Sequence, residues 1–324
     1  MDASRLNIDP AAAAATIERA IRAQVTSLRR RGVVVGVSGG IDSSVVACLC
    51  ARALGADRVQ ALLMPERDSS SDSLTLGRAL TAKLGMPVMV EDIAGTLEAA
   101  GCYARQREAI QQTFPEYGDG WKHKITLPSI LDGDRLNVSE LTVESPSGET
   151  RTSRMTAAAY LQMIAATNFK QRVRKMMEYY HADRLNYVVS GTPNRLEYDQ
   201  GFFVKLGDGS ADIKPIAHLY KTQVYAIAEY VGVPDEIRRR PPTTDTFSMP
   251  QTQEEYYFAL PYHQMDLCLY GHNHSLPAAD TAAAAGLTED QVVRVYRDID
   301  QKRRTTRYLH ARPQLVEPVR EIGD

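Results

Sequence analysis

The chain has 324 residues, of which 44% are hydrophobic, and this is enough to build one large core or two small ones. Its formal net charge of -2 excludes the global basic excess that nucleic-acid-binding proteins usually carry. No apolar run reaches the length of a membrane span, the N-terminus has no signal-peptide pattern, and the cysteines form no Cys-x-x-Cys pair. We therefore expect a cytoplasmic globular protein that binds neither nucleic acid nor a membrane.

Apolar strands alternate with helical segments through the first third of the chain. Helices are predicted over 9–31, 43–54, 72–84 and 95–113, and strands over 32–37, 59–64 and 88–90. This alternation is typical of a doubly wound parallel sheet, in which ligands bind beyond the carboxyl ends of the strands. The predicted fold class is therefore α/β with a doubly wound parallel sheet.

The pattern changes over residues 114–155, where turn residues separate short β-prone runs. This stretch is too long for an ordinary connection, so it predicts a hairpin-like insertion in a single domain that spans 1–324. A long helix over 156–180, a strand over 185–190 and a helix over 219–231 follow, and Thr288 with Gln291 forms a capping-box start for a last long helix.

The first strand runs directly into Ser-Gly-Gly-Ile-Asp-Ser-Ser at residues 38–44. A helix that begins here has free N–H groups and a favourable dipole for an anion, and two glycines let a phosphate approach the backbone. The turn lacks the lysine of a Walker loop and the Gly-x-Gly-x-x-Gly of a Rossmann loop. Asp42 is a carboxylate suited to Mg²⁺ held by a nucleotide's phosphates. The alternative is a glycine-rich turn that binds nothing.

A second apolar strand breaks into Ser-Gly-Thr-Pro-Asn-Arg-Leu-Glu at residues 190–197. Glu197 thereby reaches the same sheet edge as Asp42, and the two carboxylates could hold Mg²⁺ while phosphates supply the remaining ligands. A lone glutamate is more often a solvated surface acid, but the position of Glu197 directly after the end of a strand favours the metal-binding role.

The motif at 38–43 resembles the pyrophosphate loop of the ATP pyrophosphatase (PP-loop) superfamily, which splits ATP between its α- and β-phosphates. Later segments narrow the resemblance to the NAD synthetase family: Asn-Phe-Lys-Gln-Arg-Val-Arg at 168–174, Gly-Phe-Phe-Val-Lys-Leu-Gly-Asp-Gly-Ser-Ala-Asp at 201–212, Pro-Thr-Thr-Asp at 242–245 and Gln-Lys-Arg-Arg at 301–304. The resemblance implies an adenine nucleotide alpha hydrolase-like fold, a homodimer, and the ATP-dependent amidation of deamido-NAD to NAD through an adenylated carboxylate. No glutaminase domain precedes the loop, so ammonia is the expected nitrogen donor.

The same resemblance assigns roles residue by residue. The ATP phosphates are expected at Gly36, Val37, Ser38, Gly39, Gly40, Ile41, Asp42 and Ser43, and the rest of ATP at Thr192, Lys221 and Thr243. Deamido-NAD is expected at Arg172, Lys205, Asp212, Gln301 and Lys302, and Mg²⁺ at Asp42 and Glu197. Asp42 and Lys221 are the expected catalytic residues. The Mg²⁺ on Asp42 and the ammonium group of Lys221 would stabilise the negative charge that develops on the phosphorus centre and on the leaving pyrophosphate. Arg172 and Arg174 cannot share a helix face, so at most one of them is expected to point inward.

Two departures from the family pattern leave an alternative open. Gln301 stands where the family has histidine, and the insertion at 114–155 is unusual. Both would permit a PP-loop amide ligase that adenylates a different small-molecule carboxylate. An RNA-modifying pyrophosphatase would need a basic tract and paired catalytic cysteines, which the sequence lacks. A nucleotide-binding module without catalysis is disfavoured, because both metal-binding carboxylates are present.

Overall fold

The computed structural model describes residues 2–132, 139–244 and 246–321. Four parallel strands lie at its centre in the order β3–β2–β1–β7. They are β1 (Val33–Gly36), β2 (Val59–Leu63), β3 (Val88–Val90) and β7 (Val188–Ser190). Because β1 pairs with β2 on one side and with β7 on the other, the strand order reverses at β1. The carboxyl end of β1 is therefore the crevice at which such sheets bind ligands.

Helices cover both faces of this sheet, as the predicted doubly wound class requires. Val33 and Val35 of β1 pack with α1 (Pro10–Ser27), α2 (Ile41–Leu54) and α8 (Lys221–Tyr230). Val34 points the other way, into a cluster with Ala182 of α6 (Ala157–Leu185). This alternation follows from the two-residue period of a strand, and it explains why β1 is apolar throughout.

Three predicted helix boundaries in this layer are wrong for a local reason. The helix expected over 9–31 ends at Ser27, because the chain turns at Leu28 and Arg29, whose φ is 53°. The helix expected over 95–113 is divided into α4 (Ala94–Ala99) and α5 (Cys102–Gln111), because Gly101 takes a left-handed conformation with φ 70°. The long helix α6 continues to Leu185 and ends at Asn186, also left-handed, so β7 begins at Val188. The helix α3 (Ser71–Leu84) and the strand β3 lie where the sequence predicted them.

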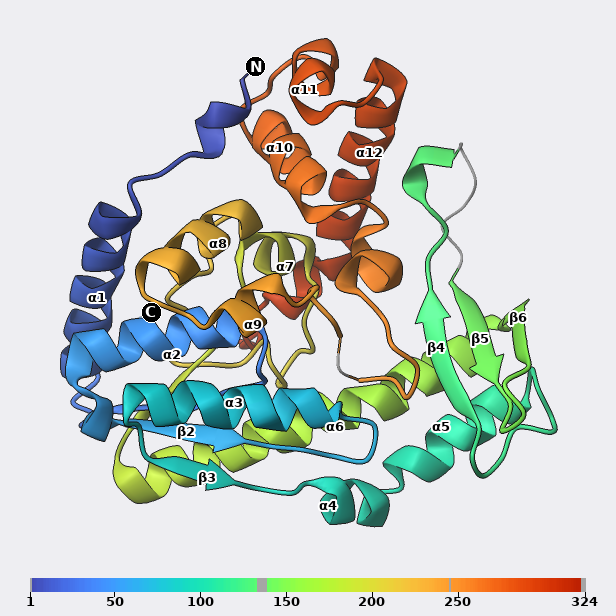
Figure 1. Cartoon of the computed structure of the whole chain (residues 1–324), viewed down its shortest axis with the longest axis horizontal. Coiled ribbons are helices and arrows are strands. Elements are labelled where there is room, and N and C mark those ends of the chain that lie inside the picture. The colour runs from blue at the N-terminus through green and yellow to red at the C-terminus, as the bar shows by residue number, and fades with distance from the viewer. Residues whose placement is uncertain (1, 133–138, 245, 322–324) are drawn as a thin grey trace.

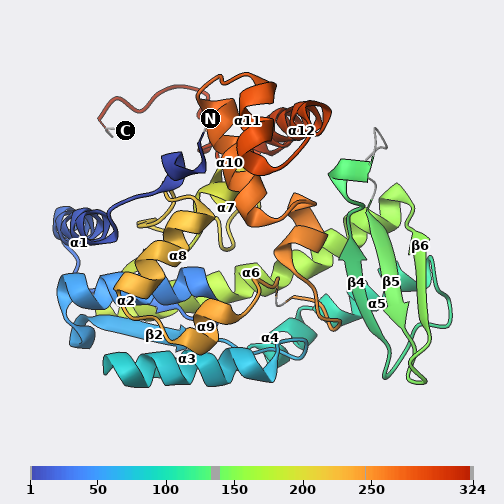
Figure 2. The same cartoon turned by 45° about the horizontal axis from the view of Figure 1, so that its top comes forward.

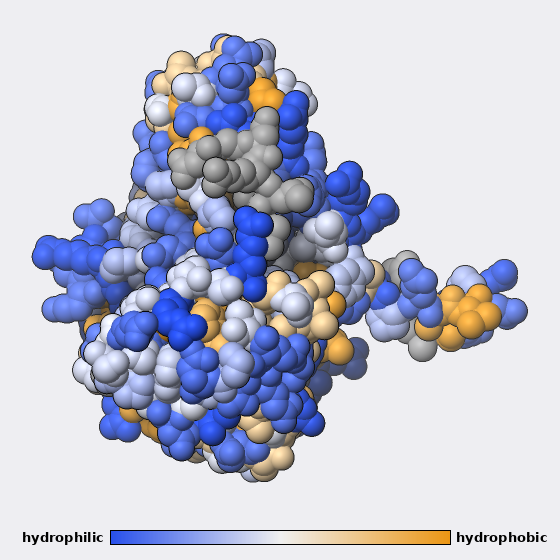
Figure 3. Space-filling view, turned by 90° about the vertical axis from the view of Figure 1, so that its right-hand side faces the viewer, coloured by the Kyte–Doolittle hydropathy of each residue, from blue (hydrophilic) through white to orange (hydrophobic). Residues whose placement is uncertain are grey.

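The stretch expected to form a hairpin contains a three-stranded antiparallel sheet, β4–β5–β6. Its strands are β4 (Lys122–Thr126), β5 (Glu140–Glu144) and β6 (Thr150–Arg154), and residues 133–138 lie outside the described part. Ile125, Leu141 and Val143 pack against Ile110 of α5 and Met163 of α6. The sheet thus stands at one end of the molecule beside α5 and α6 (Figure 1). The surface at this end is largely hydrophilic (Figure 3).

The remaining helices form a layer above the carboxyl ends of the strands (Figure 1). They are α7 (Arg195–Gln200), α9 (Asp235–Arg239), α10 (Tyr262–Asn273), α11 (Ala278–Ala285) and α12 (Glu289–Thr306). Short helical turns elsewhere in the chain are η1 (Ala3–Leu6), η2 (Ala56–Arg58), η3 (Ile130–Asp132), η4 (Glu254–Phe258) and η5 (Arg307–Leu309). The predicted capping box of Thr288 and Gln291 starts α12. Beyond η5 the chain runs away from α12 (Figure 2). Among the described residues, no helix is long and apolar enough to cross a membrane.

Candidate active site

The turn between β1 and α2 is held by its own hydroxyl groups. The backbone N–H of Ser38 donates to Ser43 Oγ over 3.2 Å, and the two serine hydroxyls are 3.1 Å apart. Gly39 has φ 74°, and a Cβ there would lie 2.6 Å from the carbonyl oxygen of Ser73. The first amides of α2 have no acceptor within their own helix, so they are available to an anion at this turn.

Two carboxylates and one ammonium group meet below the turn. Lys221, at the start of α8, is only 2% exposed and donates to Asp42 Oδ2. Asn194 Nδ2 donates to the other oxygen, Asp42 Oδ1, over 3.0 Å. Glu197 Oε2 accepts from the backbone N–H of Asn194 over 3.0 Å, and its Oε1 accepts from Gln253 Nε2 over 3.0 Å. Asp42, Glu197 and Lys221 come from three distant parts of the chain and form one charged cluster.

Burial and the neighbouring charges shift the pKa values of Glu197 and Lys221. Burial, with repulsion from Asp42, raises the pKa of Glu197 to about 8, although Lys221 partly opposes the shift. Burial alone would lower the pKa of Lys221, but the charges of Asp42 and Glu197 outweigh it and raise that pKa. Two carboxyl groups thus face a single ammonium group, and a bound cation would favour the ionised form of Glu197.

The start of α8 is positioned by a buried acid, Asp266 of α10. Its two carboxylate oxygens accept from the backbone N–H groups of Lys221 (3.1 Å) and Thr222 (2.7 Å). Burial raises the pKa of Asp266 to about 6. This contact fixes the point from which the Lys221 side chain reaches Asp42.

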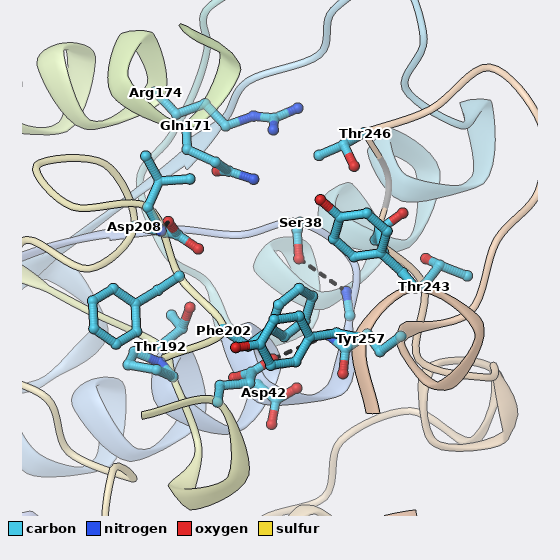
Figure 4. Close-up of a pocket in the computed structure, with 18 of the residues that line it drawn as sticks. Ser38, Asp42, Gln171, Arg174, Thr192, Phe202, Asp208, Thr243, Thr246 and Tyr257 are labelled. Carbon is cyan, nitrogen blue, oxygen red and sulfur yellow. Dashed lines mark hydrogen bonds between the residues drawn. The ribbon is translucent and has the colours of Figure 1, made fainter. Parts of the chain in front are cut away.

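A cavity of about 780 Å³ opens at the turn and the charged cluster. Gln171 and Arg174 reach into it from α6, while Thr243 and Thr246 face it from the loop opposite (Figure 4). Phe202 and Tyr257 stack with ring centroids 4.8 Å apart and form part of its wall. Its mixed lining of phosphate-directed amides, charges and aromatic rings suits a nucleotide.

Most residues predicted to contact ATP line this cavity. Gly36, Val37, Ser38, Gly40, Ile41, Asp42 and Ser43 do so, as do Thr192 and Thr243. Gly39 does not line it and instead packs against Ser73. Lys221 reaches the cavity's charged floor through Asp42. Asp245, from the same motif as Thr243, lies outside the described residues.

Four of the five residues predicted to contact deamido-NAD also line the cavity: Arg172, Lys205, Gln301 and Lys302. Arg172 Nε donates to the carbonyl of Lys205 over 3.3 Å, and Lys302 Nζ lies 2.7 Å from Asp298. The fifth residue, Asp212, lies outside the cavity wall. Its carboxylate accepts from the backbone N–H of Val189 over 2.7 Å, which ties it to β7.

Several lining residues were not predicted. Arg174 was expected to point away from the site if Arg172 pointed inward, yet both line the cavity, so that expectation was wrong. Arg174 reaches the carbonyl of Met64 and the hydroxyl of Ser69. Lys175 and Glu178 form a buried ion pair of 2.5 Å in the same wall. Only their shared helix face with Gln171 could have indicated them.

The family model described as NAD synthase matches residues 13–114 and 135–308. The chain belongs to the NAD synthase family. It is 62% identical over 320 residues, 98% of this chain and 99% of the other, to an NH(3)-dependent NAD(+) synthetase of Mesorhizobium japonicum.

Solved structures support the fold of this NAD synthase family member. An NMN synthetase from Francisella tularensis matches 97% of this chain and 100% of that chain, with a TM-score of 0.66 and 19% identity. An NH3-dependent NAD synthetase from Campylobacter jejuni matches 96% of this chain and 100% of that chain, with a TM-score of 0.62 and 22% identity. The family model leaves residues 115–134 unmatched, and they include β4 and the turn before it.

Proposed function

We propose that this chain catalyses the ATP-dependent amidation of deamido-NAD to NAD, with ammonia as the nitrogen donor. The proposal depends above all on one observation: the phosphate-directed turn, the Asp42–Lys221–Glu197 cluster and a basic wall all border a single cavity. In the reaction, the nicotinate carboxylate attacks the α-phosphorus of ATP, and the bond to the β-phosphate breaks to release pyrophosphate. Ammonia then attacks the carbonyl carbon, AMP leaves, and the nitrogen loses a proton to give the amide.

The turn and α8 would serve the phosphates. The N-terminal amides of α2 bind phosphate oxygens, and Ser38 and Ser43 hold the turn in shape. Lys221 keeps a positive charge beside the phosphorus, where negative charge increases in the transition state. Thr192 and Thr243 contact the rest of ATP from opposite sides of the cavity.

Asp42 and Glu197 fit Mg²⁺. Magnesium is commonly held by one or two carboxylates together with substrate phosphates, rather than by a complete protein cage. In keeping with this, the described residues contain no cluster of three or more His, Cys, Asp or Glu side chains that could hold a metal by themselves. When bound, the ion neutralises phosphate charge and orients the leaving pyrophosphate. Burial, followed by repulsion from Asp42, raises the pKa of Glu197, and a cation bound here would lower that pKa and favour the carboxylate form that binds it.

The other end of the cavity would bind deamido-NAD. Arg172 and Lys302 supply cations for its phosphates or carboxylate, while Gln301 and Lys205 lie along the same wall. Asp212 stays a predicted contact: it is exposed, and its Oδ1 lies 3.4 Å from the hydroxyl of Tyr179 on α6. Because Arg172 also has an exposed position on α6, a second copy of the chain against α6 would bring both residues to an interface. We therefore propose a homodimer.

We further propose that residues 1–324 form one catalytic domain, with an insertion at about 114–155, and that the protein acts in the cytoplasm. All four cysteines are buried free thiols, as expected of a protein from a reducing compartment. The substrates are small molecules, and no nucleic-acid or membrane partner is proposed.

The direct test incubates purified protein with ATP, Mg²⁺, ammonium and deamido-NAD, and separates the products by chromatography. NAD, AMP and pyrophosphate should form in equal amounts, and none should form when deamido-NAD is omitted. A parallel panel replaces deamido-NAD with nicotinate mononucleotide, nicotinate and unrelated carboxylates. Pyrophosphate release with one of these, and not with deamido-NAD, would establish the alternative amide ligase. ATP binding without any turnover across the panel would contradict both functions.

A further inference from the structure

The segment that the family model leaves unmatched lies next to the active site. We call residues 117–127, which contain β4, the brace, and residues 246–256 the active-site loop. Because the brace contacts the active-site loop, it is placed to affect the active site.

Main-chain hydrogen bonds join the brace to the active-site loop. The N–H of Met249 donates to the carbonyl of His123 over 3.1 Å, and the N–H of Leu127 donates to the carbonyl of Glu255 over 2.8 Å. The N–H of His123 donates to Ser248 Oγ over 2.9 Å. Since β4 is an edge strand, the loop occupies an edge that would otherwise be open.

Buried side chains reinforce this attachment. Phe247 is 5% exposed and packs with Ile125, Leu141 and Val143 of the small sheet. Its ring meets the imidazole of His123 edge-on, with centroids 5.8 Å apart. Gln251 is also buried and donates to the carbonyl of Ile125. The loop is therefore anchored along most of its length.

The loop in turn holds groups of the predicted ATP site. Thr252 forms an antiparallel bridge with Thr243, and the N–H of Gln253 donates to the carbonyl of Pro242 over 3.0 Å. The side chain of Gln253 donates to Glu197 Oε1 over 3.0 Å. A continuous path of hydrogen bonds thus runs from β4 through the loop to Thr243 and Glu197.

We propose that the brace is a positioning element that holds the active-site loop in place before ATP arrives, and so fixes Thr243 and, through Gln253, Glu197. Ordering a loop costs conformational entropy for each residue that is fixed. A loop that is already fixed spares ATP binding that cost, so the brace strengthens ATP binding more than it changes the chemical step. This inference rests on the proposed function for its kinetic consequence, but not for the state of the loop.

Hydrogen–deuterium exchange on the ligand-free full chain tests the state of the loop. Peptides covering 246–256 should already be protected without ATP and should gain little when a non-hydrolysable ATP analogue and Mg²⁺ are added. Ser248→Ala removes the acceptor for the N–H of His123 and should speed exchange of these peptides about fivefold, the effect of one lost hydrogen bond. Ser248→Thr keeps the hydroxyl and should restore protection. Ser153→Ala, on the exposed strand β6, is the matched control and should change nothing.

Steady-state kinetics test the consequence for the site. Ser248→Ala should raise KM for ATP severalfold, with a smaller change in kcat and in KM for deamido-NAD. Rapid exchange of the loop in the ligand-free wild type, with protection only after the analogue binds, would overturn the proposal. So would a Ser248→Ala variant whose melting temperature falls while loop exchange and KM for ATP stay unchanged. If the wild type makes no NAD, the proposed function fails, and the exchange experiment still decides whether the loop is held.

Discussion

Lys221 shows at the scale of one residue how binding chemistry and stability are joined. It is a buried cation whose charge is balanced by Asp42 and Glu197. Removing one partner of a buried ion pair typically costs about 3–5 kcal/mol, because the other charge stays buried. Asp42→Asn should therefore lower the unfolding free energy, by less than that range because Glu197 remains. It should also lower kcat for NAD formation by about a hundredfold or more, because one of the two carboxylates proposed to hold Mg²⁺ beside the phosphates is lost.

A double variant separates the two effects. Asp42→Asn with Lys221→Met removes both charges, so urea denaturation should show much of the lost stability restored. The activity should stay low, because neither the metal-binding carboxylate nor the cation is present. Recovery of NAD formation in the double variant would mean that the pair serves only the fold.

Asp42 and Glu197 were predicted because each follows a turn at the end of a strand, and Lys221 was predicted from the family resemblance. The structure brings the three side chains together, and their catalytic roles stay predictions. Arg174 was missed because helical spacing describes where Cβ atoms point, whereas the long arginine side chain extends sideways to Met64 and Ser69. Asp266 was missed because nothing in its neighbourhood on α10 indicates that it accepts from the N-terminus of α8.

At the scale of elements, local sequence signals predicted most strands and helices. They did not predict contacts between segments that lie far apart in the sequence. Turn residues correctly placed β-structure within 114–155, since each turn is a local event. The pairing of β4 with residues more than a hundred positions later leaves no such local signal, because the hydrogen bonds run between backbone groups of any sequence. A hairpin could thus be predicted in this stretch, but not its third strand, β6, and not the contact with the active-site loop.

His123, in the core between the small sheet and the loop, should make this attachment sensitive to acid. Burial lowers its pKa from 6.5 to about 4; the charges of Lys170 and Arg67 add to the shift, and Asp68 opposes it. Its Nδ1 lies 2.8 Å from the hydroxyl of Tyr117 and 3.2 Å from that of Ser248. The unfolded chain therefore binds a proton at a higher pH than the folded chain does, and folding stability falls as the pH drops from 6.5 to 4.

The expected loss over this range is about 3 kcal/mol, from the linkage between pKa and stability. Urea denaturation at several pH values measures it. His123→Phe should flatten this part of the pH profile, whereas His274→Gln, at an exposed histidine, should leave it unchanged. An unchanged profile in His123→Phe would show that other groups cause the acid sensitivity.

At the scale of the whole molecule, one cavity is built from segments spread over the entire chain. The turn after β1 and the start of α7 come from the parallel sheet, and α12 contributes Gln301 and Lys302 from the helical layer. The small sheet contributes through the loop that it anchors. The alternation of elements predicted a parallel, doubly wound sheet, but not the strand order β3–β2–β1–β7. The closure of the cavity depends on packing between layers, which no local pattern specifies.

The outer face of α6 should be where two copies of the chain meet. Arg172, Met176 and Tyr180 lie one helical turn apart on one face, where Met176 is 53% and Tyr180 58% exposed. Exposed apolar groups beside a cavity-lining arginine indicate an interface next to the site.

Light scattering after size exclusion should therefore give a dimer for the wild type, and Met176→Glu with Tyr180→Glu should give a monomer with weaker binding of deamido-NAD. Val316→Glu, at a fully exposed position beyond α12, should leave the dimer and the binding intact. A monomeric wild type at micromolar concentration would contradict the homodimer. A dimer that persists with both glutamates would show that the two copies meet at a face other than that of α6.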